Sequence, residues 1–419
     1  MDTQAQKARY PALTYRDFRL LWFGQFIANT GIQMQFVAVN WHLYRLTDSP
    51  VALGLLGLFR FLPIIIFSLI GGNFADAHNR KRILILASAS LSILSFFLAF
   101  STLSETINPF IMYTVSILIA VASSFDIPAR QAFVPNLVKK EHLPNAISLN
   151  VVMFQASLVV GPALAGILIA QLGEGYVYGL SAVSFAGALL ALFLIKTTGE
   201  PKGEKPEISI AAIAEGITFI KSQTLIWSTM LLDFFSTFFA SATVLLPIFA
   251  KDILHVGPQG FGVLAASPAI GAVVAGFVFA HFGILRKQGT ILLVSVGLFG
   301  IATIFFGISN SFLLSFLFLF IVGAGDSISA IIRNTIRQAV TPDYIRGRMS
   351  AVSMIFFMGG PQLGEFEAGL LAAWIGAPFS VVLGGIGTLI VVGLVAFGIP
   401  KVRSYQGHEH LIPQNEKVK

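Results

Sequence analysis

Long apolar stretches alternate with short polar segments along almost the whole chain. Each stretch is close to the roughly 20 residues that an α-helix needs to cross the hydrocarbon core of a bilayer. We therefore predict an all-α, polytopic membrane protein with twelve transmembrane helices. Their expected ranges are 18–45, 52–74, 83–102, 109–131, 146–171, 176–195, 225–250, 259–284, 289–308, 312–336, 348–374 and 378–399.

Composition and charge agree with this pattern. Hydrophobic residues make up 55% of the chain and charged residues 11%, and the mean hydropathy is +0.81, which excludes an ordinary soluble domain. Of the 27 Lys and Arg residues, all but Arg45, Arg60 and Lys251 fall on one side of the predicted topology. Positive loops stay inside, so we expect a multi-pass protein of the bacterial inner membrane with both termini cytoplasmic. The net charge of +7 then needs no nucleic-acid partner.

The predicted helices fall into two halves. Residues 197–209 are the longest internal run of Gly, Pro and charge, and they separate six spans from six. Isoleucines recur at helical spacing just beyond it, which predicts an amphipathic helix on the membrane surface. The expected parts are a cytoplasmic N-terminus 1–17, an N-terminal half 18–196, a cytoplasmic linker with its amphipathic helix 197–224, a C-terminal half 225–399 and a cytoplasmic tail 400–419.

The two halves also share a short sequence. RQAFVP at 130–135 ends the fourth span, and RQAVTP at 337–342 ends the tenth. Equivalent placement in each half predicts two six-helix parallel repeats, related by an axis along the membrane normal.

A basic turn at 72–82, between the second and third spans, has the pattern G-x-x-x-D-x-x-x-R-K. Its named positions are Gly72, Asp76, Arg80 and Lys81. A glycine lets two helix ends approach closely, an aspartate accepts hydrogen bonds or pairs with arginine, and the basic pair stays at the lipid headgroups. We expect this turn to form part of a cytoplasmic gate. The matching position in the second half carries Ala280 instead of an acidic residue, so the gate should be asymmetric.

This turn is similar to the signature loop of the major facilitator superfamily of secondary transporters. The chain most resembles the branch that includes bacterial enterobactin exporters and macrolide-efflux proteins. That resemblance implies the major facilitator fold and export of a siderophore, drug or similar amphiphile coupled to proton entry. The stretches that carry it are 18–22, 72–82, 125–131, 246–250, 346–348 and 361–365.

Ionisable residues inside the spans are few. Inserting each charged side chain at the bilayer centre costs about 2.5–3.5 kcal/mol of free energy, so each is expected to have a partner, contact with water or a functional role. They are Arg60, Asp126, Asp233, Asp326, Glu365 and Glu367. Asp126 lies one turn before Arg130, so we assign this pair, with Arg337, to the gate or to structural pairing. Arg60 is either half of a structural ion pair or a substrate-binding cation. Its expected acidic partner is Asp233 or Asp326.

The eleventh span carries two glutamates that cannot face the same cavity, because residues two apart on a helix are about 200° apart. Glu365 shares a face with small residues and Glu367 shares one with leucines. We therefore predict Glu365 as the proton carrier. Asp233, Asp326 and Glu367 remain the other candidates for proton coupling.

Two further features concern the substrate path. Asn29, Gln33 and Asn40 form one polar stripe on the first span, which either joins helices or lines the substrate cavity. In the fifth span, Gly161-Pro162 with Gly166 predicts a kink. This segment of the fifth span partly resembles a motif of proton-coupled antiporters.

We predict a secondary transporter that exports a small amphiphilic molecule by proton-coupled alternating access. Import by proton symport is the alternative. A membrane enzyme or receptor is disfavoured because the loops are too short for a catalytic domain. We expect a monomer whose partners are its small-molecule substrate, protons and the lipid bilayer, with no cofactor and, since there is no cysteine, no thiolate metal site.

Overall fold

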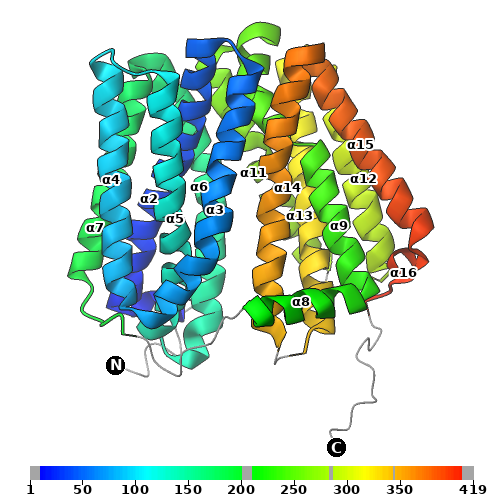
Figure 1. The fold of residues 1–419 in the computed structure, drawn as a ribbon, viewed down its shortest axis with the longest axis horizontal. Helices are drawn as coiled ribbons and strands as arrows, with labels where there is room; N and C mark the ends of the chain where they lie inside the picture. Colours follow the sequence, from blue (N-terminus) through cyan, green and yellow to red (C-terminus); the bar gives the residue numbers. More distant parts are fainter. Residues whose placement is uncertain (1–9, 201–209, 283–285, 343–344, 408–419) are drawn as a thin grey trace, which may run out of the picture. The chain divides into compact units, whose positions relative to one another are not determined.

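The computed structural model describes residues 10–200, 210–282, 286–342 and 345–407, and these contain helices but no strand (Figure 1). The expected all-α class is confirmed. The long helices are α2 Arg16–Thr47, α3 Pro50–Ala77, α4 Arg80–Leu103, α5 Pro109–Leu137, α6 Leu143–Leu172, α7 Glu174–Leu194, α9 Thr224–Phe239, α11 Gly257–Phe282, α12 Gln288–Gly307, α13 Phe312–Val340, α14 Arg346–Ile375 and α15 Ala377–Gly398. Shorter elements are η1 Pro11–Thr14, η2 Lys140–His142, α8 Ile210–Ser222, η3 Ala242–Leu245, α10 Leu246–Ile248, η4 Phe249–Ile253 and α16 Pro400–Ser404.

Ten helical segments in the described part of the chain are long and apolar enough to cross a membrane. Two more, α2 and α14, contain 32 and 30 residues but are more polar. Polar residues on a membrane helix turn toward protein or water. We therefore expect the polar faces of α2 and α14 to turn toward the interior of the protein.

Several helices begin at side-chain caps. The side chains of Ser49, Asn79 and Asn108 accept hydrogen bonds from backbone N–H groups three residues ahead, and so start α3, α4 and α5. The helix α6 ends where Gly173 takes φ = 89°, a backbone conformation that favours glycine. Polar residues at the predicted turns thus fix where the apolar helices start and stop.

The seventh predicted span is not one regular helix. The helix α9 ends at Phe239, and the chain continues through 3₁₀, α and π turns to Ile253. Pro247 lies inside this segment and has no N–H to donate. Short π segments within helices often occur at functional sites.

The chain divides into two compact units. Unit 1 contains Met1–Pro206 and Pro247–Ala266, and unit 2 contains Glu207–Leu246 and Ser267–Lys419. A short hairpin from the start of the second six spans, hereafter the 247–266 hairpin, thus packs with the first six. The hairpin begins at Pro247, and Pro268 lies two residues beyond its end.

Each unit has its own apolar core. In unit 1, α2 packs against α6 and α7, and α4 packs against α5 and α7. In unit 2, α12 packs against α13 and α15, and α14 packs against α9. Figure 1 shows α8 lying crosswise at the ends where α9 and α14 begin, and Ile220 of α8 is buried in the same cluster as Ile226 and Met349.

Glycines of α6 allow very close helix contacts. A Cβ built on Gly161 would lie 2.4 Å from Cβ of Gln33 in α2, and one built on Gly166 would lie 2.9 Å from Cα of Gly262 in α11. The helix α6 continues through Pro162 as a single helix. The expected kink stays a prediction, and both glycines pack closely against neighbouring helices.

The 247–266 hairpin is also held to α2 by side chains. Lys251 forms an ion pair with Asp48, and the hydroxyl of Tyr44 donates to the carboxylate of Asp252. Trp41 stacks on Phe261 with ring centroids 5.6 Å apart. The backbone contact at Gly262 and these side-chain contacts all hold the 247–266 hairpin against α2 and α6.

We expect Gly262→Ala to destabilise the protein, because the added methyl would lie 2.5 Å from the carbonyl oxygen of Pro162, and backbone cannot move aside as a side chain can. Overpacking of this kind costs about 1–3 kcal/mol. Thermal unfolding of the purified protein should therefore begin at a lower temperature.

Gly187→Ala is the matched control, since nothing lies within 4 Å of a Cβ at that helical position. It should leave the unfolding temperature unchanged or raise it slightly, because alanine favours helix. Equal unfolding temperatures for the two variants would contradict the close contact.

Candidate functional site

The most distinctive charged group of unit 2 is a buried ion pair between two membrane helices. Nη2 of Arg333 in α13 lies 2.7 Å from Oδ1 of Asp233 in α9, and both side chains are 12% exposed. The same nitrogen lies 3.7 Å from Oδ1 of Asp326, whose side chain is 48% exposed. The hydroxyl of Ser329 accepts a further hydrogen bond from Arg333. One guanidinium thus holds both aspartates that we predicted as coupling candidates.

A small cavity of about 50 Å³ adjoins this pair. Arg337 lies one turn beyond Arg333, lines the cavity and donates a hydrogen bond to Asn334. We predicted Arg337 as a gate residue, and the structure places it beside Asp233. The residues that line the cavity are Ile226, Thr229, Met230, Asp233, Ala330, Arg333, Asn334, Arg337, Ser353, Phe356 and Phe357.

The two glutamates of α14 differ in exposure. Glu365 is buried, whereas Glu367 is intermediate. The same helix packs against α9 at Gly360 and Gly364, where a built Cβ would lie 2.4 Å from Oγ1 of Thr237 and 2.1 Å from the carbonyl oxygen of Phe238. The assignment of Glu365 as proton carrier stays a prediction.

In unit 1 the pair expected on the fourth span is formed. Nε and Nη2 of Arg130 donate to Oδ2 and Oδ1 of Asp126 at 2.9 and 2.7 Å, a two-point contact within one turn of α5. Arg130 is 8% exposed. Charge-assisted, bidentate contacts of this kind are among the stronger hydrogen bonds in proteins.

The basic turn contacts the end of α5 and the segment after α7. Arg80 donates to the carbonyl of Ala132 at 3.0 Å, and Lys81 donates to the carbonyl of Ile195 at 2.6 Å. The backbone N–H of Arg80 donates to the carbonyl of Gly199 at 2.8 Å. The start of the linker is therefore fastened to this turn.

Gly72 and Asp76 of the predicted turn have no described side-chain contacts. Gly72 and Asp76 lie in α3, but at positions where the structure describes no side chains. Their part in a gate stays a prediction.

The polar stripe of α2 has separate contacts along its length. Asn29 donates to the sulfur of Met153 at 3.4 Å, Gln33 lies against Gly161, and buried Asn40 donates to the carbonyl of Phe36 at 3.0 Å. Gln35, on another face, accepts from Ser95 at 2.7 Å. These contacts join α2 to neighbouring helices or stay within α2, and the choice between joining helices and lining the substrate cavity stays a prediction.

Arg60 lies over the ring of Phe36, with its guanidinium carbon 4.4 Å from the ring centroid. A cation over an aromatic face is attracted by the ring quadrupole. Asp233 pairs with Arg333 in the structure, and the expected pairing of Arg60 with Asp233 or Asp326 stays a prediction. The sequence did not single out Arg333 for this role, because its inward face is set by packing.

Sequence reasoning missed a polar cluster where α2 ends and α7 begins. Nδ1 of His42 lies 3.2 Å from the hydroxyl of Tyr178, and Arg45 pairs with Glu174 at 3.1 Å. His42, Tyr178 and Glu174 are all buried. The histidine within a predicted span was an available signal. Glu174 gave none, because it fell between two predicted spans.

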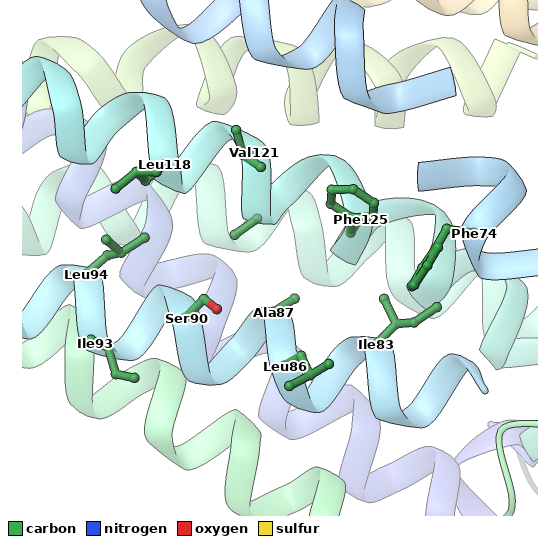
Figure 2. A pocket seen from close by; sticks show the side chains of 11 residues that line it. Phe74, Ile83, Leu86, Ala87, Ser90, Ile93, Leu94, Leu118, Val121 and Phe125 are labelled. Carbon is green, nitrogen blue, oxygen red and sulfur yellow. The ribbon is translucent and has the colours of Figure 1, made fainter. Parts of the chain in front are cut away.

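An apolar cavity of about 490 Å³ lies among α3, α4 and α5. Figure 2 shows Phe74 and Phe125 at one end and Leu94 and Leu118 at the other. Ser90 is the polar residue in its lining. We do not regard it as the candidate site, because specific binding sites also contain a few well-placed polar groups.

Residues 8–417 match the family described as transmembrane secretion effectors. The chain belongs to this family, and it is a multi-pass transporter of the major facilitator superfamily. The resemblance inferred from the basic turn is thereby confirmed.

Curated relatives agree along nearly the whole length. The enterobactin exporter EntS of Citrobacter koseri is 26% identical over 383 residues, covering 91% of each chain. The enterobactin exporter EntS of Salmonella typhi is 27% identical and covers 91% of this chain and 92% of its own. These relatives are exporters.

Solved structures show the same fold. A bacterial homologue of the human lysosomal transporter Spinster, inward-facing and occupied, superimposes with a TM-score of 0.73 at 16% identity, covering 93% of this chain and 98% of its own. A bacterial homologue of the iron transporter ferroportin, inward-facing, superimposes with a TM-score of 0.66 at 18% identity, covering 90% of this chain and 98% of its own. The predicted twelve-helix transporter fold is confirmed.

We expect Arg80→Ala to lower transport by about tenfold without loss of protein from the membrane, because it removes a charged donor worth roughly 1.5–3 kcal/mol from the end of α5. Substrate-driven proton flux in proteoliposomes, over a panel of siderophores and drugs, would measure it.

Arg82→Ala is the control, since Arg82 is exposed and neighbours Arg80 in the same basic turn. It removes the same charge and should change the flux little. Equal fluxes in the two variants would show that charge at the headgroups, rather than the Ala132 contact, is what this turn provides.

Proposed function

We propose that the protein exports a small amphiphilic molecule, such as a siderophore or drug, across the bacterial inner membrane in exchange for protons. Alternating access is the expected mechanism, in which proton binding shifts the balance between inward-open and outward-open states. Both termini are cytoplasmic in this proposal, as the distribution of Lys and Arg indicates.

The buried Asp233–Arg333 pair is the observation that carries the proposal. Burying a pair of charges in a membrane helix bundle is costly, and hydrophobic replacement is often neutral or stabilising. A buried ion pair between two membrane helices is therefore a functional candidate in a protein that belongs to a transporter family. Its contacts are reversible, because protonation of the carboxylate would remove one of the charges.

The energy available for such exchange is adequate. One charge that crosses the full potential supplies about 2.3 kcal/mol per 100 mV. A pH gradient adds to this. Candidates for the group that carries the proton are Glu365, Asp233, Asp326 and Glu367, with Glu365 favoured because it is buried and lies on the small-residue face of α14.

In this proposal the 247–266 hairpin belongs to the outer side of the gate. Its contacts are two polar ties and one aromatic stack with residues of α2 and its C-cap, and the glycine contact with α6. All of these can form and break without unfolding a helix. The basic turn with Asp126 and Arg130 would serve the inner side.

The direction of transport can be tested with inverted and right-side-out membrane vesicles. We expect a transported siderophore or drug to accumulate in inverted vesicles when their lumen is acidified, because the lumen corresponds to the outside of the cell. Proton-driven accumulation in right-side-out vesicles would instead show import by symport and contradict export.

We expect Glu365→Gln to abolish gradient-driven accumulation, because glutamine cannot take up and release a proton. Substrate binding should persist, since the amide keeps the size and polarity of the side chain. Uptake into proteoliposomes with and without a pH gradient would measure both.

Glu367→Gln is the matched control, two residues away on the leucine-bearing face of the same helix. It should reduce accumulation less. If accumulation persists in Glu365→Gln, that residue has no part in coupling and the assignment moves to Asp233 or Asp326.

A further inference from the structure

We infer that the cavity between α9, α13 and α14 binds the oxyanion of the transported molecule, and that this molecule is an anionic amphiphile with an apolar or aromatic body. The inference rests on the proposed function, and it names the chemical class of the substrate. A carboxylate is the simplest group of the required kind.

Two guanidinium groups give the cavity its anion preference. Arg333 is engaged by Asp233 and, at longer range, by Asp326. Arg337 also lines the cavity, and its hydrogen bond in the structure goes to the neutral Asn334. Among the residues that the structure describes, Arg337 forms no ion pair with a carboxylate. Arginine presents a planar set of donors that matches a carboxylate.

Ser353 supplies the second, independent observation. It lies on α14, lines the cavity and is 4% exposed. Its hydroxyl oxygen is buried and has no hydrogen-bond partner among the described residues. A buried polar group without a partner costs about 1–3 kcal/mol. A ligand oxygen that accepts from this hydroxyl would remove that cost.

The size and lining of the cavity indicate what is attached to the charged group of the ligand. A volume of about 50 Å³ accommodates a small charged group but not a whole drug-sized molecule. Met230, Phe356 and Phe357 form the apolar part of its lining, and the Phe356 ring lies edge-on to Trp227 with centroids 5.8 Å apart. These side chains suit an apolar or aromatic body attached to the oxyanion.

Asp233 has a positioning role in this site. The charged groups that act on its carboxylate in the described structure are Arg333, Asp326 and Arg337, all from α13. From α14 the lining residues are Ser353, Phe356 and Phe357, which are not charged. Asp233 therefore holds Arg333 at the wall and leaves the Arg337 guanidinium as the cation available to the ligand.

Binding of 2-naphthoate and 2-naphthamide to the full-length protein in phosphatidylcholine nanodiscs tests this. The two probes share an aromatic body and differ in the carboxylate. We expect naphthoate to bind at least about tenfold more tightly, because a hydrogen bond to a charged group is worth roughly 1.5–3 kcal/mol. Equal affinities would overturn the inference.

Variants then locate the site. Arg337→Gln should weaken naphthoate binding about tenfold or more, whereas Arg403→Gln, which removes the same charge from an exposed position of unit 2, should leave it unchanged. Equal effects of the two substitutions would show that net charge, and not this cavity, attracts the anion.

Ser353→Ala guards against a simple folding effect. Removing a buried hydroxyl that has no partner should leave the unfolding temperature equal or higher, yet it should weaken naphthoate binding severalfold. An unchanged affinity in this variant would remove Ser353 from the site and overturn the inference.

Addition of phosphatidylglycerol to the nanodiscs separates a transported anion from a lipid headgroup. We expect the affinity for naphthoate to stay the same. If the anionic lipid weakens naphthoate binding in the wild type but not in Arg337→Gln, the cavity holds lipid phosphate and the substrate assignment is wrong.

The outcome is separable from that of the proposed function. Naphthoate binding that depends on Arg337 without proton-coupled flux of any anion would contradict exchange transport and keep the binding site. Proton-coupled flux of neutral or cationic molecules together with no naphthoate binding would contradict the anion-binding site and keep exchange transport.

Discussion

The absence of water from the bilayer core is the constraint on which the rest of this structure depends. Backbone N–H and C=O groups there must be paired within the chain, and helices achieve this locally. Small polar side chains obey the same rule. The hydroxyls of Ser124, Ser295 and Thr303 each donate to the carbonyl one turn earlier. Such residues can be placed inside apolar helices without a partner helix.

Charges cannot be satisfied so cheaply, and several carboxylates in the described structure are paired with arginines. Asp126 is held by Arg130 on its own helix, Asp233 by Arg333 on another, and Glu174 by Arg45 across α2 and α7. A pair within one helix moves as a unit. A pair that joins two helices can be broken by their movement, which makes Asp233–Arg333 the better candidate for a conformational role.

Close helix contacts follow from the weak drive for helix association in lipid, where small residues allow backbones to approach. The contacts at Gly166 and Gly262 show this within unit 1, and those at Gly360 and Gly364 show it within unit 2. The 247–266 hairpin depends on such a contact together with polar ties. Prolines at or near both ends of the hairpin interrupt the helical hydrogen bonding where the chain passes from one unit to the other.

The sequence by itself determined the fold class, the twelve spans and the family, because hydrophobic length, charge asymmetry and the basic turn are local properties of the chain. It also predicted the Asp126–Arg130 pair, since residues one turn apart on a helix meet without help from packing. Only tertiary structure decided that Asp233 pairs with Arg333, that Ser353 faces a cavity, and that Gly166 meets Gly262. These depend on how each helix is rotated against its neighbours, and hydrophobic periodicity along a single helix does not specify which residue of a neighbour it will meet.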